Sequence, residues 1–305
     1  MHVLVTGATG FVGRRLVPAL LDAGHEVTAL VRDAGRYDGP PGVRVVVVDL
    51  LDRESIDAAV GGGENVVDAA YYLVHSMTAR DDFAARDRRA AANFADAASA
   101  AGVDRVIYLG GLGEERDRLS PHLRSRREVE RVLAAGTYDL TTLRAAIIVG
   151  PGSAGFEMVV QLASRLPVMA TPRWVRTPCQ PVGVDDVIAY LVGVLDGPET
   201  AGETYEIGGP EVLTYAEMLR RTGRHLGHEP MLVTVPVLTP RLSAYWVGLM
   251  TDVPWSVARP LIEGLKNPVV VHDDRLSRLV DVDPTPFDEA VRRALTERAA
   301  AETGA

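Results

Sequence analysis

Short apolar runs alternate with helix-length amphipathic segments through the first half of the chain. The runs are nearly continuously apolar and rich in β-branched residues, which is typical of strands that are buried on both faces. Between two of them, residues 80–101 repeat apolar side chains at spacings of three, four and seven, as one face of a helix does. Strands that alternate with helices predict an α/β fold, a doubly wound parallel sheet of the Rossmann type. The predicted strands are residues 2–6, 26–31, 43–48, 65–74, 104–110 and 139–150.

The regularity loosens after residues 149–153, and prolines become frequent. The pattern then predicts a helix capped by Asp185, a strand that ends in glycines, a second helix, and an apolar aromatic segment interrupted by a proline. We therefore predict two domains, residues 1–152 and a smaller α/β domain at residues 153–305, with about residues 183–208 returning to the first domain. The four predicted elements of this half lie at residues 182–195, 203–209, 214–227 and 239–265.

The composition narrows the classes of function. The 305 residues are 47% hydrophobic and carry a net charge of −9. This acidic balance argues against a nucleic-acid partner, because phosphate binding requires a basic face. Cys179 is the only cysteine, which excludes an intramolecular disulfide framework and favours a reducing compartment. No N-terminal targeting signal and no apolar run of membrane-spanning length is visible, so we expect a cytoplasmic protein.

The stretch TGATGFVG at residues 6–13 follows the first predicted strand and precedes the first predicted helix. Gly7 allows a tight turn, Gly10 lets the backbone approach a pyrophosphate, and Gly13 lets the helix pack closely on the strand. The amino end of the helix then faces the anion. Three glycines in this context predict a dinucleotide site, and a purely structural glycine turn is the alternative. The other candidate cofactor-binding residues of this loop are Thr9, Phe11 and Val12.

The spacing T-G-x-x-G-x-x-G resembles that of the extended and atypical short-chain dehydrogenases/reductases, which include the NmrA-like proteins. Residues 48–56, VDLLDRESI, are similar to the acidic turn of that family, and the resemblance implies that Asp49 and Leu50 contact adenine. The stretches YYLVHSM and SPHLRSRREV are similar to a group of bacterial NAD(P)H-binding proteins. The resemblance covers nearly the whole chain and implies an NAD(P)-binding Rossmann domain followed by a substrate domain.

The end of the second predicted strand bears on the choice of cofactor. An NAD site requires a carboxylate there to bind the ribose hydroxyls, but alignment with the family places Val31 at that position, followed by Arg32. A guanidinium suits a 2′-phosphate because it is planar, always charged and bidentate. We therefore expect NADP(H) to be preferred over NAD(H), with Arg32 and Arg36, and third Arg14, as candidate phosphate ligands. The alternative is an ordinary surface arginine, with Asp33 binding a ribose hydroxyl.

The catalytic residues of the family are missing from their expected places. The resemblance implies a tyrosine and a lysine four residues apart on one helix, and a hydroxyl at the end of the fifth strand. The helix SPHLRSRREVERVL places His122 at the tyrosine and Arg126 at the lysine. Gly110 or Gly111 stands at the hydroxyl position, and Lys266 is the only lysine in the chain. We therefore predict that the family's proton relay has been lost.

Two histidines remain candidates for catalysis. His122 and Arg126 would share one helix face, where Arg126 could hold ribose hydroxyls and lower the pKa of His122, leaving it mostly neutral at pH 7. A solvated charged helix without chemistry is the alternative. His75 follows the fourth predicted strand, where ligands collect in doubly wound sheets, and it is either catalytic or merely caps the strand. Tyr71 and Tyr72 would then pack against helices.

These features predict an NADPH-dependent oxidoreductase that acts on a small apolar quinone or conjugated carbonyl. Hydride transfer to a quinone gives a delocalised phenolate, so it depends less on a strong general acid than the reduction of a ketone does. The substrate would bind between the carboxyl edge of the sheet and residues 239–265. The alternatives are a non-catalytic NADP(H) sensor or scaffold, such as an accessory subunit of respiratory complex I, and an enzyme like the nucleotide-sugar epimerases. The spacing of histidines and carboxylates predicts no metal site.

Overall fold

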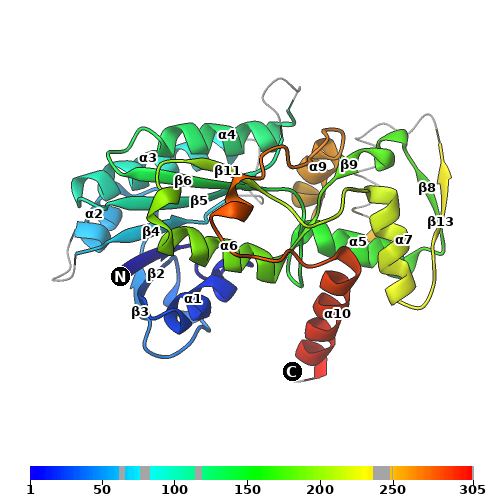
Figure 1. The fold of residues 1–305 in the computed structure, drawn as a ribbon, viewed down its shortest axis with the longest axis horizontal. Coiled ribbons are helices and arrows are strands. Elements are labelled where there is room, and N and C mark those ends of the chain that lie inside the picture. Colours follow the sequence, from blue (N-terminus) through cyan, green and yellow to red (C-terminus); the bar gives the residue numbers. More distant parts are fainter. Residues whose placement is uncertain (62–65, 76–82, 114–118, 236–247, 249, 304–305) are drawn as a thin grey trace.

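The computed structural model describes residues 1–61, 66–75, 83–113, 119–235, 248 and 250–303. Among these residues, seven parallel strands form a central sheet in the spatial order β3, β2, β1, β4, β5, β6 and β11 (Figure 1). The predicted α/β fold with a doubly wound parallel sheet is therefore confirmed. The strands are β1 (His2–Thr6), β2 (Glu26–Val31), β3 (Arg44–Val47), β4 (Ala69–Tyr72), β5 (Arg105–Gly111), β6 (Asp139–Ala145) and β11 (Thr204–Ile207).

Apolar side chains on both sides of the strands bury both faces of the sheet. The hydroxyl of Tyr71 donates a hydrogen bond to Leu191 O (2.8 Å) in the core of one face. Tyr72 points to the other face and packs against Phe94, with 5.1 Å between the ring centroids. The chain order reverses between β1 and β4, so their carboxyl ends border the crevice in which doubly wound sheets bind ligands.

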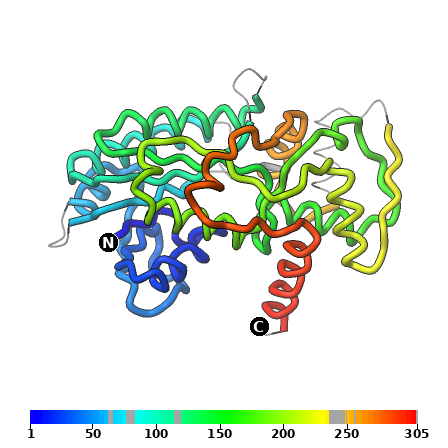
Figure 2. Tube along the Cα trace, in the orientation of Figure 1, coloured from blue at the N-terminus to red at the C-terminus, as the bar shows by residue number. Residues whose placement is uncertain are grey.

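Helices cover the two faces of the sheet (Figure 1). Helices α1 and α6 pack together on one face, and α2, α3 and α4 form a row on the other. Helix α6 and strand β11 lie within the second half of the sequence but return to the sheet, as the path of the chain in Figure 2 shows. The bounds are α1 (Gly13–Asp22), α2 (Arg53–Gly61), α3 (Phe83–Ala100), α4 (Pro121–Leu133) and α6 (Val184–Asp196).

The remaining elements surround a separate apolar core beside the carboxyl end of the sheet. Helix α5 packs against α7 and α9, and α9 also contacts α4 of the first layer. Three two-stranded pairs, β7–β10, β9–β12 and β8–β13, complete the described part of this body. Its elements are β7 (Ile148–Val149), α5 (Ala154–Arg165), β8 (Val168–Thr171), β9 (Pro178–Cys179), β10 (Val182–Gly183), β12 (Leu213–Thr214), α7 (Tyr215–His225), β13 (Met231–Thr234), α9 (Trp255–Gly264) and α10 (Phe287–Thr303).

Two local predictions from the sequence are wrong. Residues 139–150 were expected to form one strand, but β6 ends at Ala145 and β7 then pairs with β10 outside the central sheet. The expected cap Asp185 is exposed and does not cap α6, whose N-cap residue is Gly183. The neighbouring Asp186 is buried instead, and its carboxylate accepts hydrogen bonds from N (2.9 Å) and Oγ1 (2.8 Å) of Thr285. Asp186 therefore anchors the C-terminal segment.

Part of the predicted aromatic segment cannot be placed. Residues 239–247 and 249 of the predicted range 239–265 lie outside the described residues, and α9 forms the second half of that range. In the part of the chain that is described, no helix is long and apolar enough to cross a membrane. Among the same residues, no group of three histidines, cysteines or carboxylates is placed to hold a metal ion.

Candidate functional site

The glycine loop between β1 and α1 has a geometry that only glycine allows. Gly7 adopts a positive φ of 71°, and a Cβ atom there would lie 3.1 Å from the backbone of Leu73. A Cβ atom on Gly13 would lie 2.2 Å from Gly7 O, far inside contact distance. The N-cap residue of α1 is Val12, whose side chain makes no cap hydrogen bond. The amino end of α1 is therefore left for an anion, and this cradle fits the pyrophosphate of a dinucleotide.

The loop after β2 brings two arginines to the same edge of the sheet. Strands β1 and β2 pair with Thr6 opposite Leu30, so the loop that contains Arg32 follows directly beside the glycine turn. Arg32 and Arg36 are exposed, and their side chains make no hydrogen bond or ion pair with the described residues. The carboxylate of Asp33, in contrast, already has a partner within its own turn, because its Oδ1 accepts a hydrogen bond from Gly35 N (3.0 Å). The two guanidinium groups are thus available to an anion.

The structure separates the two residues that the family resemblance assigned to adenine. Asp49 follows β3 at the surface, and its Oδ1 accepts a hydrogen bond from Leu51 N (2.9 Å). The side chain of Leu50 is buried in the core beneath α2 and α3, and its carbonyl oxygen accepts a hydrogen bond from Asn93 Nδ2 (3.0 Å). A carboxylate at the position of Asp49 can reach a ligand, whereas Leu50 offers only its backbone.

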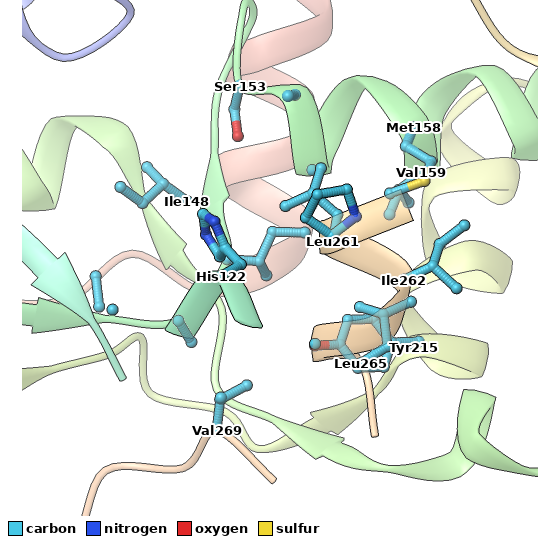
Figure 3. Close-up of a pocket in the computed structure, with 18 of the residues that line it drawn as sticks. His122, Ile148, Ser153, Met158, Val159, Tyr215, Leu261, Ile262, Leu265 and Val269 are labelled. Atoms are coloured by element: carbon cyan, nitrogen blue, oxygen red, sulfur yellow. The ribbon is translucent and has the colours of Figure 1, made fainter. Parts of the chain in front are cut away.

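A cavity of about 790 Å³ extends from the glycine loop into the second body. The carboxyl ends of β5 and β6 form its floor, and residues 146–148, in the break between β6 and β7, form part of its wall. Helices α5 and α9 contribute the opposite walls, where Figure 3 shows Met158, Val159, Leu261 and Ile262. The lining is mainly aliphatic. Its side chains with polar atoms among the described residues are His75, His122, Arg126, Ser153, Thr171, Trp174 and Tyr215.

His75 and His122 meet at the cavity wall although 47 residues separate them. Nε2 of His75 lies 3.1 Å from Nδ1 of His122, and the ring centroids are 4.7 Å apart. Nδ1 of His75 lies 3.0 Å from Oδ2 of Asp87 in α3, and both of these side chains are less than a tenth exposed. Helix α4 begins at Pro121 and Ser120 caps it, which places His122 in its first turn.

Burial lowers the pKa of both imidazoles. For His75, burial followed by the charge of Arg126 lowers the pKa to about 4, and Asp87 acts in the opposite direction. For His122, burial, then His75, then Arg126 lower the pKa well below its ordinary value. The predicted lowering of the pKa of His122 is therefore confirmed, but burial and not the guanidinium is the main cause. Both rings are neutral at pH 7.

Arg126 lies on the same face of α4 as His122 and also lines the cavity. Its Nη1 donates a hydrogen bond to Leu109 O (3.1 Å), at the end of β5. Its Nε is buried and makes no hydrogen bond with any described residue. Because Arg126 lines the cavity, a ribose oxygen of a bound cofactor would satisfy this donor.

The structure also shows which groups do not serve as acids in the described site. Tyr71 and Tyr72 are buried in the two cores, and burial raises the pKa of each well above its ordinary value. A Cβ atom on Gly110 would lie 3.1 Å from Cε1 of Tyr108, and one on Gly111 would lie 3.0 Å from Cδ2 of Leu123. A hydroxyl side chain at either glycine would therefore displace a packed neighbour.

Two residues of the site were missed by the sequence analysis. Asp87 lies in the apolar repeat of α3, where a single carboxylate resembled one more surface charge. Trp174 lines the cavity, and its Nε1 is buried without a hydrogen bond to a described residue. Asp87 could have been noticed as an acidic residue on the apolar stripe, but no local pattern distinguishes Trp174. Cys179 is fully buried, and burial raises the pKa of its thiol to about 11.

Comparison with known proteins identifies the family. The family model described as NAD(P)H-binding matches residues 7–165. A 3-diazoavenalumate denitrifying reductase of a Streptomyces species is 31% identical over 281 residues, which span 81% of this chain and 88% of that protein. The mitochondrial NADH dehydrogenase [ubiquinone] 1 alpha subcomplex subunit 9 of Arabidopsis thaliana is 28% identical over 304 residues, which span 92% of this chain and 73% of that protein.

The fold is similar to that of known sugar-nucleotide enzymes. The crystal structure of a nucleoside-diphosphate-sugar epimerase from Staphylococcus aureus superposes with a TM-score of 0.77, covering 96% of this chain and all of the other, at 16% identity. Identity this low supports the fold alone. The family match and the glycine cradle agree on the cofactor class. The chain therefore belongs to the NAD(P)H-binding family.

Proposed function

We propose that the protein is an NADPH-dependent reductase of a small, apolar quinone or conjugated carbonyl compound. The observation that carries this proposal is the cavity of about 790 Å³, which joins the glycine loop to an aliphatic chamber in the second body. Bound NAD(P)H supplies a hydride. An apolar chamber that opens from the dinucleotide cradle suits an acceptor whose affinity comes from burial of apolar surface. In this proposal residues 1–152 bind the cofactor, and most of residues 153–305 bind the substrate.

The chemistry of the cavity wall favours a conjugated acceptor over a simple ketone. The chain has no tyrosine–lysine pair, and Gly110 and Gly111 leave no hydroxyl at the end of β5. A ketone becomes a localised alkoxide that needs a strong acid, whereas a quinone becomes a delocalised phenolate. His122 and Arg126 are the polar groups that border the chamber beside this edge. Arg126 would hold the nicotinamide ribose through its buried Nε.

The preference for NADP(H) is part of the proposal. It is supported by the two exposed guanidinium groups of Arg32 and Arg36 and by the occupation of the Asp33 carboxylate within its own turn. A 2′-phosphate would find two positive charges in that loop, where one oxygen of the Asp33 carboxylate is already bonded to Gly35 N. A cytoplasmic location is likewise a proposal, which rests on the single buried cysteine and the cofactor class.

A non-catalytic NADP(H) scaffold is the second candidate. Its support is the relative named as a subunit of NADH dehydrogenase, which matches over 92% of this chain. An epimerase-like activity has weaker support, because a sugar nucleotide is polar and the chamber wall is mainly aliphatic. Neither alternative requires hydride transfer to an apolar acceptor.

Single-turnover oxidation of bound NADPH separates these functions. Purified protein loaded with one equivalent of NADPH is mixed with quinones, enones and aliphatic ketones, and the nicotinamide absorbance is followed. We expect oxidation by quinones or enones, and slower oxidation by ketones, by about 10²–10⁴-fold, the usual contribution of a general acid. Tight NADPH binding without oxidation by any acceptor would favour the scaffold. Rapid oxidation by aliphatic ketones would contradict the proposed substrate class.

A further inference from the structure

Three side chains from three different elements form a chain of close polar contacts that ends at the cavity. Asp87 comes from α3, His75 follows β4, and His122 lies in the first turn of α4. The two contacts are 3.0 Å from Oδ2 of Asp87 to Nδ1 of His75, and 3.1 Å from Nε2 of His75 to Nδ1 of His122. Nε2 of His122 makes no hydrogen bond with any described residue, and His122 lines the cavity. The open end of the chain thus faces the ligand.

The order of donors and acceptors in this chain is determined by its buried end. An ionised carboxylate only accepts hydrogen bonds, so Nδ1 of His75 carries a proton and donates it to Asp87. A neutral His75 then has a lone pair on Nε2, and His122 must donate to it from Nδ1. Both rings are consequently held as the Nδ1–H tautomer, and Nε2 of His122 presents a lone pair to the cavity.

We propose that Asp87, His75 and His122 form a proton relay that replaces the missing tyrosine–lysine pair of the family. His122 is the catalytic residue, because its Nε2 exchanges a proton with an oxygen atom of the bound ligand. Asp87 and His75 are positioning residues, which set the tautomer of His122 and share its charge. This inference rests on the proposed reductase function, and it revises the sequence-based prediction that a proton relay has been lost altogether.

The proton transfer balances within the relay. We call the relay loaded when His122 carries a proton on both ring nitrogens. The resulting imidazolium is stabilised through His75 by the carboxylate of Asp87. When the acceptor has gained the hydride, its anionic oxygen takes the proton from Nε2, so an N–H bond breaks and an O–H bond forms. The relay returns to its neutral form and regains one proton from solvent. The reduced ligand, now a hydroxyl compound, then donates a hydrogen bond to the bare Nε2.

The groups that pack around the relay determine the pH at which it takes up its extra proton, here called loading. Arg126 of α4 opposes loading by its charge, and burial of both rings opposes it as well. Asp87 of α3 favours loading. Tyr72 of β4 and Tyr108 of β5 also face this region, but burial raises the pKa of each and keeps it neutral. The loaded fraction therefore grows as the pH falls, and removal of the Asp87 charge makes loading harder.

Nitrogen-15 NMR of the imidazole side chains tests the relay without any turnover. In the protein saturated with NADP⁺ near neutral pH, we expect His75 and His122 to be neutral and protonated at Nδ1, with assignment from His75→Gln and His122→Gln. In Asp87→Asn, the loss of the obligatory acceptor should alter the tautomer of His75, whereas Asp96→Asn, an exposed carboxylate on the same helix, should leave both rings unchanged. Protonation of either wild-type ring at Nε2 alone would overturn the relay.

The pH dependence of the single-turnover rate gives the functional test. With an acceptor that the wild type reduces, the rate should rise as the pH falls, and Asp87→Asn should be slower by about 10- to 100-fold, a typical effect of a carboxylate that orients a functional imidazole. Its profile should also move to lower pH, while Asp87→Glu should recover part of the rate and Asp96→Asn should match the wild type. NADPH affinity should be unchanged in all three variants. An Asp87→Asn profile identical to the wild type would refute the relay.

The two measurements distinguish failure of the relay from failure of the proposed function. Suppose that none of the acceptors is reduced by the NADPH-loaded wild type, while both rings are found as Nδ1–H tautomers. The reductase proposal then fails and the inferred geometry stands. If the wild type is an active reductase but His122→Gln retains its rate and pH profile, the function stands and the relay is wrong. His122→Gln should otherwise lower the rate by about 10- to 100-fold, as Asp87→Asn does, because a conjugated acceptor depends less on a general acid than a ketone does.

Discussion

Replacing Gly13 with alanine tests whether the glycine loop is the dinucleotide cradle. The added Cβ atom would lie 2.2 Å from Gly7 O and 2.7 Å from Ala8 Cα, whereas carbon atoms in contact lie about 3.5–4.0 Å apart. Because the obstacles are backbone atoms, no rotation of a side chain relieves them, and the turn must move away from α1. Overpacking of this kind costs about 1–3 kcal/mol. If the displaced turn must be restored to bind the pyrophosphate, NADPH affinity falls roughly 5- to 140-fold.

A graded series sharpens this test. A Cβ atom on Gly10 would lie 3.1 Å from Gly7 O, so Gly10→Ala needs only a small adjustment of the turn. The substitution still places a methyl group where the backbone should approach the cofactor. Gly61, the last residue of α2, has no atom of a described residue within 4 Å of an added Cβ, so Gly61→Ala is the matched control and should gain up to about 1 kcal/mol of stability.

Chemical denaturation and fluorescence titration with NADPH measure the two effects separately. Gly13→Ala should lose both stability and affinity, although the better helix propensity of alanine offsets part of the change in stability. Gly10→Ala should lose affinity with little change in stability, and Gly61→Ala should bind as the wild type does. Wild-type NADPH affinity in Gly13→Ala would refute the placement of the cofactor on this loop.

Three further predictions follow from the charged groups. Arg32→Ala should remove most of the preference for NADPH over NADH in calorimetry, because one charged contact to a phosphate contributes about 1.5–3 kcal/mol; equal affinities in the wild type would contradict the NADP(H) assignment. Asp186→Ala should lower the free energy of unfolding by about 2–4 kcal/mol, because two hydrogen bonds to Thr285 are lost and the partly buried amide of Thr285 is left without a partner. A change below about 1 kcal/mol would show that this anchor is unimportant. The depressed pKa of His75, about 4 in the folded protein against 6.5 in the unfolded chain, means that the unfolded state binds more protons between these values. Stability should therefore fall as the pH is lowered from about 6.5 to 4, and denaturation curves should show a shallower fall in His75→Gln.

Several features of this protein follow from the sequence because they depend on short-range rules. Continuous apolar runs predicted β1, β2 and β5 nearly to the residue, since strands buried on both faces leave no room for polar positions. The glycine spacing identified the cradle, because Gly7 and Gly13 occupy positions where a Cβ atom does not fit. A single lysine in the whole chain was enough to exclude the family's tyrosine–lysine pair.

Other features depend on contacts between residues that are distant in the sequence. The break after Ala145 is invisible in an apolar run that is continuous across it, because only the pairing of β7 with β10 diverts the chain. That diversion places residues 146–148 in the wall of the cavity, opposite α9. The local pattern therefore predicted correctly that the segment is apolar and buried, but it predicted wrongly that the segment continues as one strand.

The candidate site shows the same division most clearly. The sequence by itself named His75 and His122 separately and left each with a structural alternative, because histidine at a strand end or on a charged helix has no distinguishing pattern. Only the tertiary structure decided that the two rings meet 3.1 Å apart and that the carboxylate of Asp87 in α3 lies behind them. The order of the strands in the sheet brings the end of β4 next to that of β5, and α3 and α4 pack together over this edge. Proton-transfer geometry is a property of that packing. A hydrogen bond is sensitive to differences of a few tenths of an ångström in the donor–acceptor distance, which no periodicity in the sequence encodes.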